Sequence, residues 1–79
     1  DADLDAQDQS LFAALKTLRL AFAKERGVPA YVIFRDRSLV EIARNKPANE
    51  AEFANIFGVG DAKVRDFARP FLALVADFS

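Results

Sequence analysis

The chain has 79 residues, 52% of them hydrophobic, and it contains neither cysteine nor histidine. A single domain of this length buries only about 60–65% of the surface that its unfolded chain exposes, so its core must be held by packing, without disulfides or Cys-ligated zinc. The missing histidine and cysteine also exclude the usual general base, the thiol nucleophile and the common metal ligands. We therefore expect a domain with no catalytic site, no metal and no cofactor.

The formal net charge of −1 hides an uneven distribution of acidic residues. Four of the twelve (Asp1, Asp3, Asp5 and Asp8) lie within the first eight positions, and the rest of the chain is mildly basic. This acidic start predicts a linker over residues 1–9, followed by one domain over residues 10–79. The sequence shows no run of about 18 apolar residues and no signal-peptide pattern, so we expect an intracellular protein that does not bind membranes.

Apolar residues at helical spacing predict a first helix over about Gln9 to Arg26, capped by Asp8 or Ser10. Gly27 would end this helix in a left-handed conformation, and Pro29 would prevent its continuation. The inward face is predicted to consist of Leu11, Ala14, Leu15, Leu18, Ala21 and Phe22.

The next segment, Ala30–Phe34, is β-prone in composition, but nothing else in the sequence suggests a strand to pair with it, so we predict a short helical turn. Asp36 or Ser38 would then cap a third helix that ends at Pro47. Ser38 and Glu41 have the spacing of a capping box, in which each side chain binds a free N–H of the first turn. The inward residues of this helix would be Leu39, Ile42 and Ala43.

Two further helices are predicted around the turn Gly58–Gly60. Asn49 and Glu52 repeat the capping-box spacing at the start of the fourth helix, and Asp61 opens the fifth. Pro70 cannot donate to the carbonyl of Asp66, which predicts a kink or a break near residues 66–70. Five helices in about 70 residues predict an all-α fold, a compact orthogonal bundle. The inward residues of the last helix would be Val64, Phe67, Phe71, Leu74, Val75 and Phe78.

The first candidate site is the turn within residues 53–64, which has the apolar-x-x-apolar-x-Gly-apolar-Gly form of a helix-hairpin-helix. Its glycines allow close approach of a phosphate, which the free N–H groups and positive dipole of the following helix can bind, and Lys63 adds a positive charge. Alternatively, Gly58 and Gly60 merely permit a tight turn with positive φ. Asp61 at the helix start favours this architectural interpretation.

The second candidate site surrounds Tyr31, the only tyrosine. A tyrosine among cations suits single-stranded nucleic acid, because its ring can stack on an unpaired base while the cations attract the backbone. The alternative places the ring in the core with its hydroxyl at the rim. The neighbouring cations are Lys24 and Arg26 on one side and Arg35 and Arg37 on the other.

Other charged residues carry less information. Lys16 and Arg19, together with Lys24, form a stripe opposite the leucine face of the first helix, which is either a DNA-backbone contact or solvated surface. The internal acids stand mostly at helix starts, where capping explains them. These acids are Asp36, Glu50, Glu52 and Asp61. The G-x-x-x-x-G-K-[ST] spacing of a P-loop is absent from the sequence, so ATP hydrolysis is not predicted.

Four blocks in order resemble the HRDC (helicase and RNase D C-terminal) family: LFAALKTLR at 11–19, GVPAYVIF at 27–34, SLVEIA at 38–43, and the stretch that begins GVG at 58 and runs to 72. The resemblance covers about residues 10–76 and is strongest to the HRDC modules of bacterial RecQ-type DNA helicases. It implies a five-helix, SAM-like accessory domain, monomeric on its own, in a cytoplasmic, nucleoid-associated helicase of DNA repair and recombination. Such a domain binds single-stranded or partial-duplex DNA weakly and tunes the helicase carried elsewhere in the polypeptide.

By position, Tyr31 matches the aromatic of the family's P-P-Y-x-x-F turn, which is implicated in DNA contact, with basic residues of the first helix and the hairpin as helpers. Arg35, Arg37 and Lys63 extend that set. The chain has Phe22 and Ala23 where a more polar surface is usual. This departure favours the alternative of a module that docks on other helicase domains or on a partner protein, and an RNase D-type RNA context is a third option.

Overall fold

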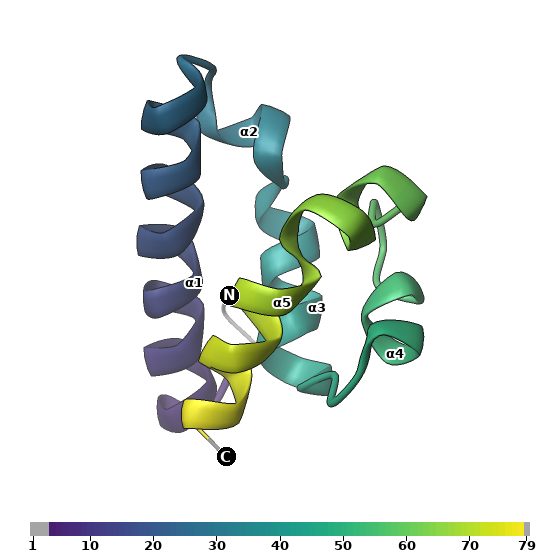
Figure 1. The fold of residues 1–79 in the computed structure, drawn as a ribbon. Helices are drawn as coiled ribbons and strands as arrows, with labels where there is room; N and C mark the ends of the chain where they lie inside the picture. The colour runs from purple at the N-terminus through teal and green to yellow at the C-terminus, as the bar shows by residue number, and fades with distance from the viewer. Residues whose placement is uncertain (1–3, 79) are drawn as a thin grey trace.

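The computed structural model describes residues 4–78, and this range is all-α. The helices are α1 (Ala6–Arg26), α2 (Ala30–Ile33), α3 (Asp36–Asn45), α4 (Glu50–Ala54) and α5 (Asp61–Asp77). α1 stands along one side of the molecule and packs on α2, α3 and α5, whereas α4 packs on α5 at the opposite side (Figure 1). The predicted five-helix bundle is confirmed. Between residues 4 and 78, no helix has the length and apolar character needed to cross a membrane.

α1 begins earlier than predicted, because the cap is Asp5, whose carboxylate accepts a hydrogen bond from the backbone N–H of Asp8 at 2.8 Å. Neither Asp8 nor Ser10 caps the helix: both lie inside it, and Asp8 forms an ion pair with Lys46 after α3. Leu4 is buried in the core. Residues 4–9, which the sequence assigned to a linker, are therefore part of the fold, and residues 1–3 lie outside the described residues.

The end of α1 and the following turn agree with the prediction. Gly27 adopts φ 67°, and the N–H of Val28 donates to the carbonyl of Ala23 at 3.0 Å. Ala23 is buried, whereas Ala21 is exposed, contrary to the predicted pattern. The next four residues form α2, as expected.

The capping predictions hold for α4 but not for α3. In α4, Asn49 accepts from the N–H of Glu52 at 2.9 Å, and the Glu52 carboxylate accepts from the N–H of Ala48 at 2.8 Å. No side chain in the described part of the chain caps α3. Asp36 pairs instead with Arg19 on α1 at 2.7 Å, because its carboxylate lies beside that guanidinium.

α5 continues through Pro70 as one helix, so of the two predicted alternatives, a kink or a break, the break is wrong. Its two halves point in different directions (Figure 1), as expected where a proline leaves a carbonyl one turn earlier without its helical donor.

The centre of the core is a cluster of phenylalanine rings. Phe71 is fully buried, and the centroids of the four surrounding rings lie 5.0–6.4 Å from its own. Edge-to-face and offset contacts at such distances add to the stabilisation that burial of the rings provides. These rings bring together α1, the α2–α3 junction, α4 and α5, and belong to Phe22, Phe34, Phe53 and Phe67.

Candidate nucleic-acid interface

Tyr31 lies on the surface, with 63% of its area exposed, so the alternative that placed its ring in the core is wrong. The proline at position 29 starts α2 with φ −63°, and the last turn of α2 places Ile33 and Phe34 in the core. With these two side chains buried, Tyr31 and its neighbour Val32 point outward. The single turn of α2 therefore presents the Tyr31 ring at the surface, next to residues that are anchored in the core.

The hairpin turn after α4 packs directly against α3. The hydroxyl of Ser38 donates to the carbonyl of Phe57 at 2.5 Å, and the carboxylate of Glu41 accepts from the N–H of the same residue at 3.1 Å. The predicted capping box of Ser38 and Glu41 is therefore wrong. Both side chains bind the hairpin backbone, since its unpaired polar groups lie within their reach.

The two glycines of the turn differ in role. Gly58 has φ 79°, and a Cβ at this position would lie 2.8 Å from the hydroxyl oxygen of Ser38. Gly60, the N-cap of α5, has φ −97° and open space around it. The tight-turn interpretation therefore applies to Gly58 and not to Gly60, while phosphate binding by the hairpin stays a prediction.

A pocket of about 290 Å³ joins the two candidate sites that the sequence treated separately. We call it the Tyr31 pocket. It combines two exposed aromatic rings with two cationic side chains, and no acidic residue within 4–78 lines it. Its lining residues are Tyr31, Ile33, Phe34, Arg35, Ser38, Phe57, Gly58 and Lys63.

Lys63 has a structural role beside the Tyr31 pocket. Its ammonium donates to the carbonyls of Val32 at 2.5 Å and Ile33 at 2.6 Å, which are free at the end of α2. Burial lowers the pKa of Lys63, and nearby Arg26 lowers it further, while Asp66 acts in the opposite direction. The charge therefore lies at the pocket but is already engaged by the fold.

The three arginines near the Tyr31 pocket differ in their contacts. The Arg37 guanidinium lies 3.8 Å from the centroid of the Phe57 ring and 3.7 Å from the carboxylate of Glu41. Arg35, which precedes α3, is exposed at the pocket wall. Arg26 lies over the Phe67 ring at 4.8 Å, beside a neighbouring hollow that Lys63 also lines.

The predicted basic stripe on α1 is not continuous. The side chain of Arg19 is only 11% exposed, because it pairs with Asp36 and donates to the carbonyl of Phe34 at 3.0 Å. Lys16 and Lys24 are exposed, and the ammonium of Lys16 lies 4.7 Å from the ring of Phe12. Arg19 thus holds α1 to the α2–α3 junction and leaves only the two lysines on the surface stripe.

Among the exposed residues that line the Tyr31 pocket, Phe57 is the one that the sequence did not assign to a site. The fourth helix was predicted to continue to the turn at Gly58–Gly60, which would have placed Phe57 in the same helix as Phe53 and Ile56. α4, however, ends at Ala54, so the chain turns and Phe57 is 43% exposed while the other two are buried. No sequence signal marked this early end.

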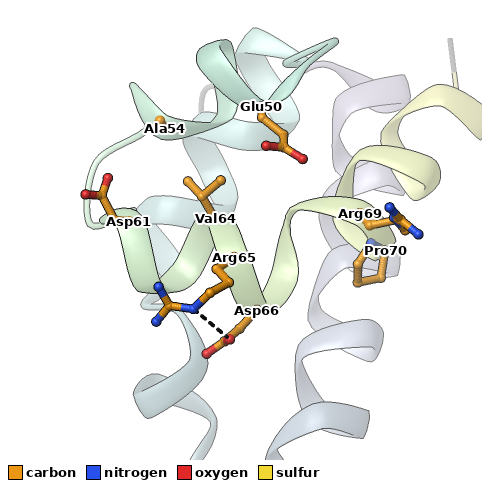
Figure 2. Close-up of a pocket in the computed structure, with 8 residues that line it drawn as sticks. All are labelled: Glu50, Ala54, Asp61, Val64, Arg65, Asp66, Arg69 and Pro70. Carbon is orange, nitrogen blue, oxygen red and sulfur yellow. Dashed lines mark ion pairs between the residues drawn. The ribbon is translucent and has the colours of Figure 1, made fainter.

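A second hollow lies between α4 and α5, and Figure 2 shows the charged side chains around it. We call it the α4–α5 groove; its volume is about 760 Å³. Three carboxylates and two guanidinium groups line it, and Arg65 lies 3.9 Å from Asp66. This mixture of charges is poorly suited to a polyanion. The lining residues are Glu50, Ala54, Asp61, Val64, Arg65, Asp66, Arg69 and Pro70.

The fold and the Tyr31 pocket define a small all-α module with an aromatic and cationic surface. The HRDC domain family model matches residues 8–75, and the chain belongs to this family. It is accordingly a non-catalytic accessory domain.

The relatives are large helicases. The chain is 41% identical over 68 residues to the ATP-dependent DNA helicase RecQ of Pasteurella multocida, and 39% identical over 70 residues to that of Haemophilus influenzae. It is also 41% identical over 68 residues to the ATP-dependent DNA helicase UvrD2 of Mycobacterium tuberculosis. These alignments cover 86%, 89% and 86% of this chain but only 11%, 11% and 10% of the respective relatives.

Proposed function

We propose that the domain binds single-stranded DNA weakly through the Tyr31 pocket and thereby modulates a RecQ-type ATP-dependent DNA helicase in the same polypeptide. The observation that carries this proposal is the exposed Tyr31 ring, held on α2 beside Arg35 and Lys63 in a pocket whose described lining contains no carboxylate. An aromatic ring offers a sequence-tolerant stacking surface for a base, and the cations attract the phosphates on either side of it. The names of the relatives support the helicase context.

Weak binding follows from the size of this surface. One stacked base and two or three phosphate contacts give a salt dependence with a slope of about −2 in a plot of log K against log salt concentration. The half-buried Lys63 and the core-bound Arg19 contribute little to that slope, since both are engaged within the fold. Any partial-duplex substrate would be bound through its single-stranded part.

Tyr31→Ala is expected to weaken binding of single-stranded DNA by fivefold or more, roughly the loss of one base stack. Fluorescence anisotropy of a labelled oligothymidylate at low salt measures this change. Tyr31→Phe is the matched control, because it keeps the ring and removes only the hydroxyl, and it should bind like the wild type. Equal affinity of the Tyr31→Ala variant and the wild type would contradict the proposal.

The second candidate function is docking on another protein surface, such as the helicase core, through the α4–α5 groove. Its supporting observation is the mixed charge of the groove, which suits a protein surface with alternating charges. Phe22 and Ala23, the departure that first favoured docking, do not contribute to this surface. Ala23 is buried, and the Phe22 ring packs 5.1 Å from that of Phe67 in the core.

Charge reversal tests docking separately from DNA binding. If the groove docks on the helicase, Arg69→Glu should change the DNA-dependent ATPase activity of the full-length parent and leave the DNA affinity of the isolated domain unchanged. Arg44→Glu, a reversal at an exposed position of α3 that lines neither the groove nor the Tyr31 pocket, is the control for a general charge effect. An unchanged ATPase activity in Arg69→Glu would exclude docking through this groove.

A further inference from the structure

Phe57 is the one phenylalanine within residues 4–78 whose side chain is exposed. Leaving a large apolar ring in water forgoes the stabilisation that its burial would provide. The other described phenylalanines are buried or partly buried in or against the core, which makes this ring a candidate for contact with a ligand.

The backbone of Phe57 is held on both sides. Its N–H donates to Glu41 at 3.1 Å, and its carbonyl accepts from Ser38 at 2.5 Å. Ser38 is only 2% exposed and is the buried polar residue of the described core. α3 therefore uses two polar side chains to fix the position of one exposed aromatic residue, which is how a preorganised binding group is supported.

Phe57 and Tyr31 line the same pocket from different elements, the hairpin and α2. A volume of about 290 Å³ is at the small end of ligand sites, which suits a nucleobase better than a larger cofactor. We propose that Phe57 is a second stacking residue, so that Tyr31 and Phe57 together hold two adjacent unpaired bases of single-stranded DNA. This inference rests on the proposed function and adds to it that two bases are bound, with one aromatic ring for each.

The charges around Phe57 favour a nucleic acid over an apolar peptide. Arg37 lies against the ring, and Arg35 and Lys63 line the pocket beside it. The acid that contacts Phe57, Glu41, is already occupied by the Phe57 N–H and by Arg37. Bases with a flanking phosphate backbone match this combination of rings and cations.

Phe57→Ala should weaken binding of an oligothymidylate about fivefold to thirtyfold in the anisotropy measurement. Phe57→Leu, which keeps an apolar side chain but has no ring, should show most of the same loss. An oligomer of the same length without bases is the ligand control: the wild type and Phe57→Ala should bind it equally. Circular dichroism checks that each variant is folded.

A second readout uses the absence of tryptophan from this chain. Phe57→Trp should bind DNA at least as well as the wild type, and the fluorescence of the introduced indole should be quenched as bases stack on it. Ala51→Trp is the control, because Ala51 is exposed on α4 and lines neither the Tyr31 pocket nor the α4–α5 groove. Its fluorescence should not respond to DNA.

The outcomes separate this inference from the proposed function. If Tyr31→Ala loses affinity while Phe57→Ala does not, the DNA-binding proposal stands and Phe57 is not a stacking residue. If the wild type does not bind DNA at all, both fail. If Phe57→Ala binds DNA normally but no longer binds the helicase core, the ring is a protein contact and the inference is overturned.

Discussion

Phe71→Ala is expected to lower the free energy of unfolding by about 3–5 kcal/mol, the usual cost of emptying a fully buried aromatic position. The cavity would open at the point where four other rings meet, so no single helix can move to fill it. A domain this small has a stability near the lower end of about 5–15 kcal/mol. The variant is therefore expected to retain only about 0–2 kcal/mol, so that a measurable fraction of it, up to about half, is unfolded at 25 °C.

Urea unfolding followed by far-UV circular dichroism measures the loss for Phe71→Ala. Phe71→Leu is the matched control, since it keeps most of the volume and should cost about 1–1.5 kcal/mol. A loss below about 1 kcal/mol for the alanine variant would mean that the ring cluster is not the centre of the core.

Gly58→Ala is expected to cost about 2–3 kcal/mol, from two separate effects. A left-handed backbone is unfavourable for alanine by about 1–2 kcal/mol, and φ at this position is 79°. The new Cβ would also lie 2.8 Å from the Ser38 hydroxyl, so the hydrogen bond to Phe57 must be distorted or lost.

Two controls isolate these effects. Gly60→Ser should cost nothing measurable, because Gly60 has an ordinary φ, open surroundings and an N-cap position that serine favours. In a Ser38→Ala background, the cost of Gly58→Ala should fall to about 1–2 kcal/mol, the backbone part alone. A full cost in that background would show that the contact with Ser38 carries no energy.

The sequence predicted the helices well because apolar periodicity and capping are local signals. Gly27, the α2 turn and the Asn49 cap depend only on neighbouring residues, and all three were predicted correctly. The error at the start of α1 is local too: Asp5 was counted as linker charge, although its position three residues before Asp8 also allows it to cap the helix.

Contacts between elements were not predictable in the same way. Ser38 and Glu41 have a capping-box spacing, yet they bind a turn sixteen to nineteen residues further along the chain. Arg19 similarly reaches the α2–α3 junction across the fold. Nothing in the local sequence distinguishes a side chain that binds its own helix from one that binds a distant turn.

The candidate site, too, was predictable only where it depends on local sequence. Tyr31 could be selected from composition and resemblance, but its joining with Phe57 and Lys63 in one pocket depends on how α2, α3 and the hairpin pack. Exposure of Phe57 follows from the early end of α4, which no residue pattern announced. The tertiary structure thus brings the two candidate sites, each only weakly indicated by its local sequence, into one pocket.

The central claim is that single-stranded DNA binds at the Tyr31 pocket, and an NMR titration of the isotope-labelled domain with an oligothymidylate tests it most directly. We predict that DNA changes the amide chemical shifts of Tyr31, Arg35, Phe57 and Lys63, that these changes are smaller at higher salt, and that the amides along the α4–α5 groove change little. The absence of shifts at high DNA concentration and low salt, or shifts confined to Glu50, Arg65 and Arg69, would contradict the account.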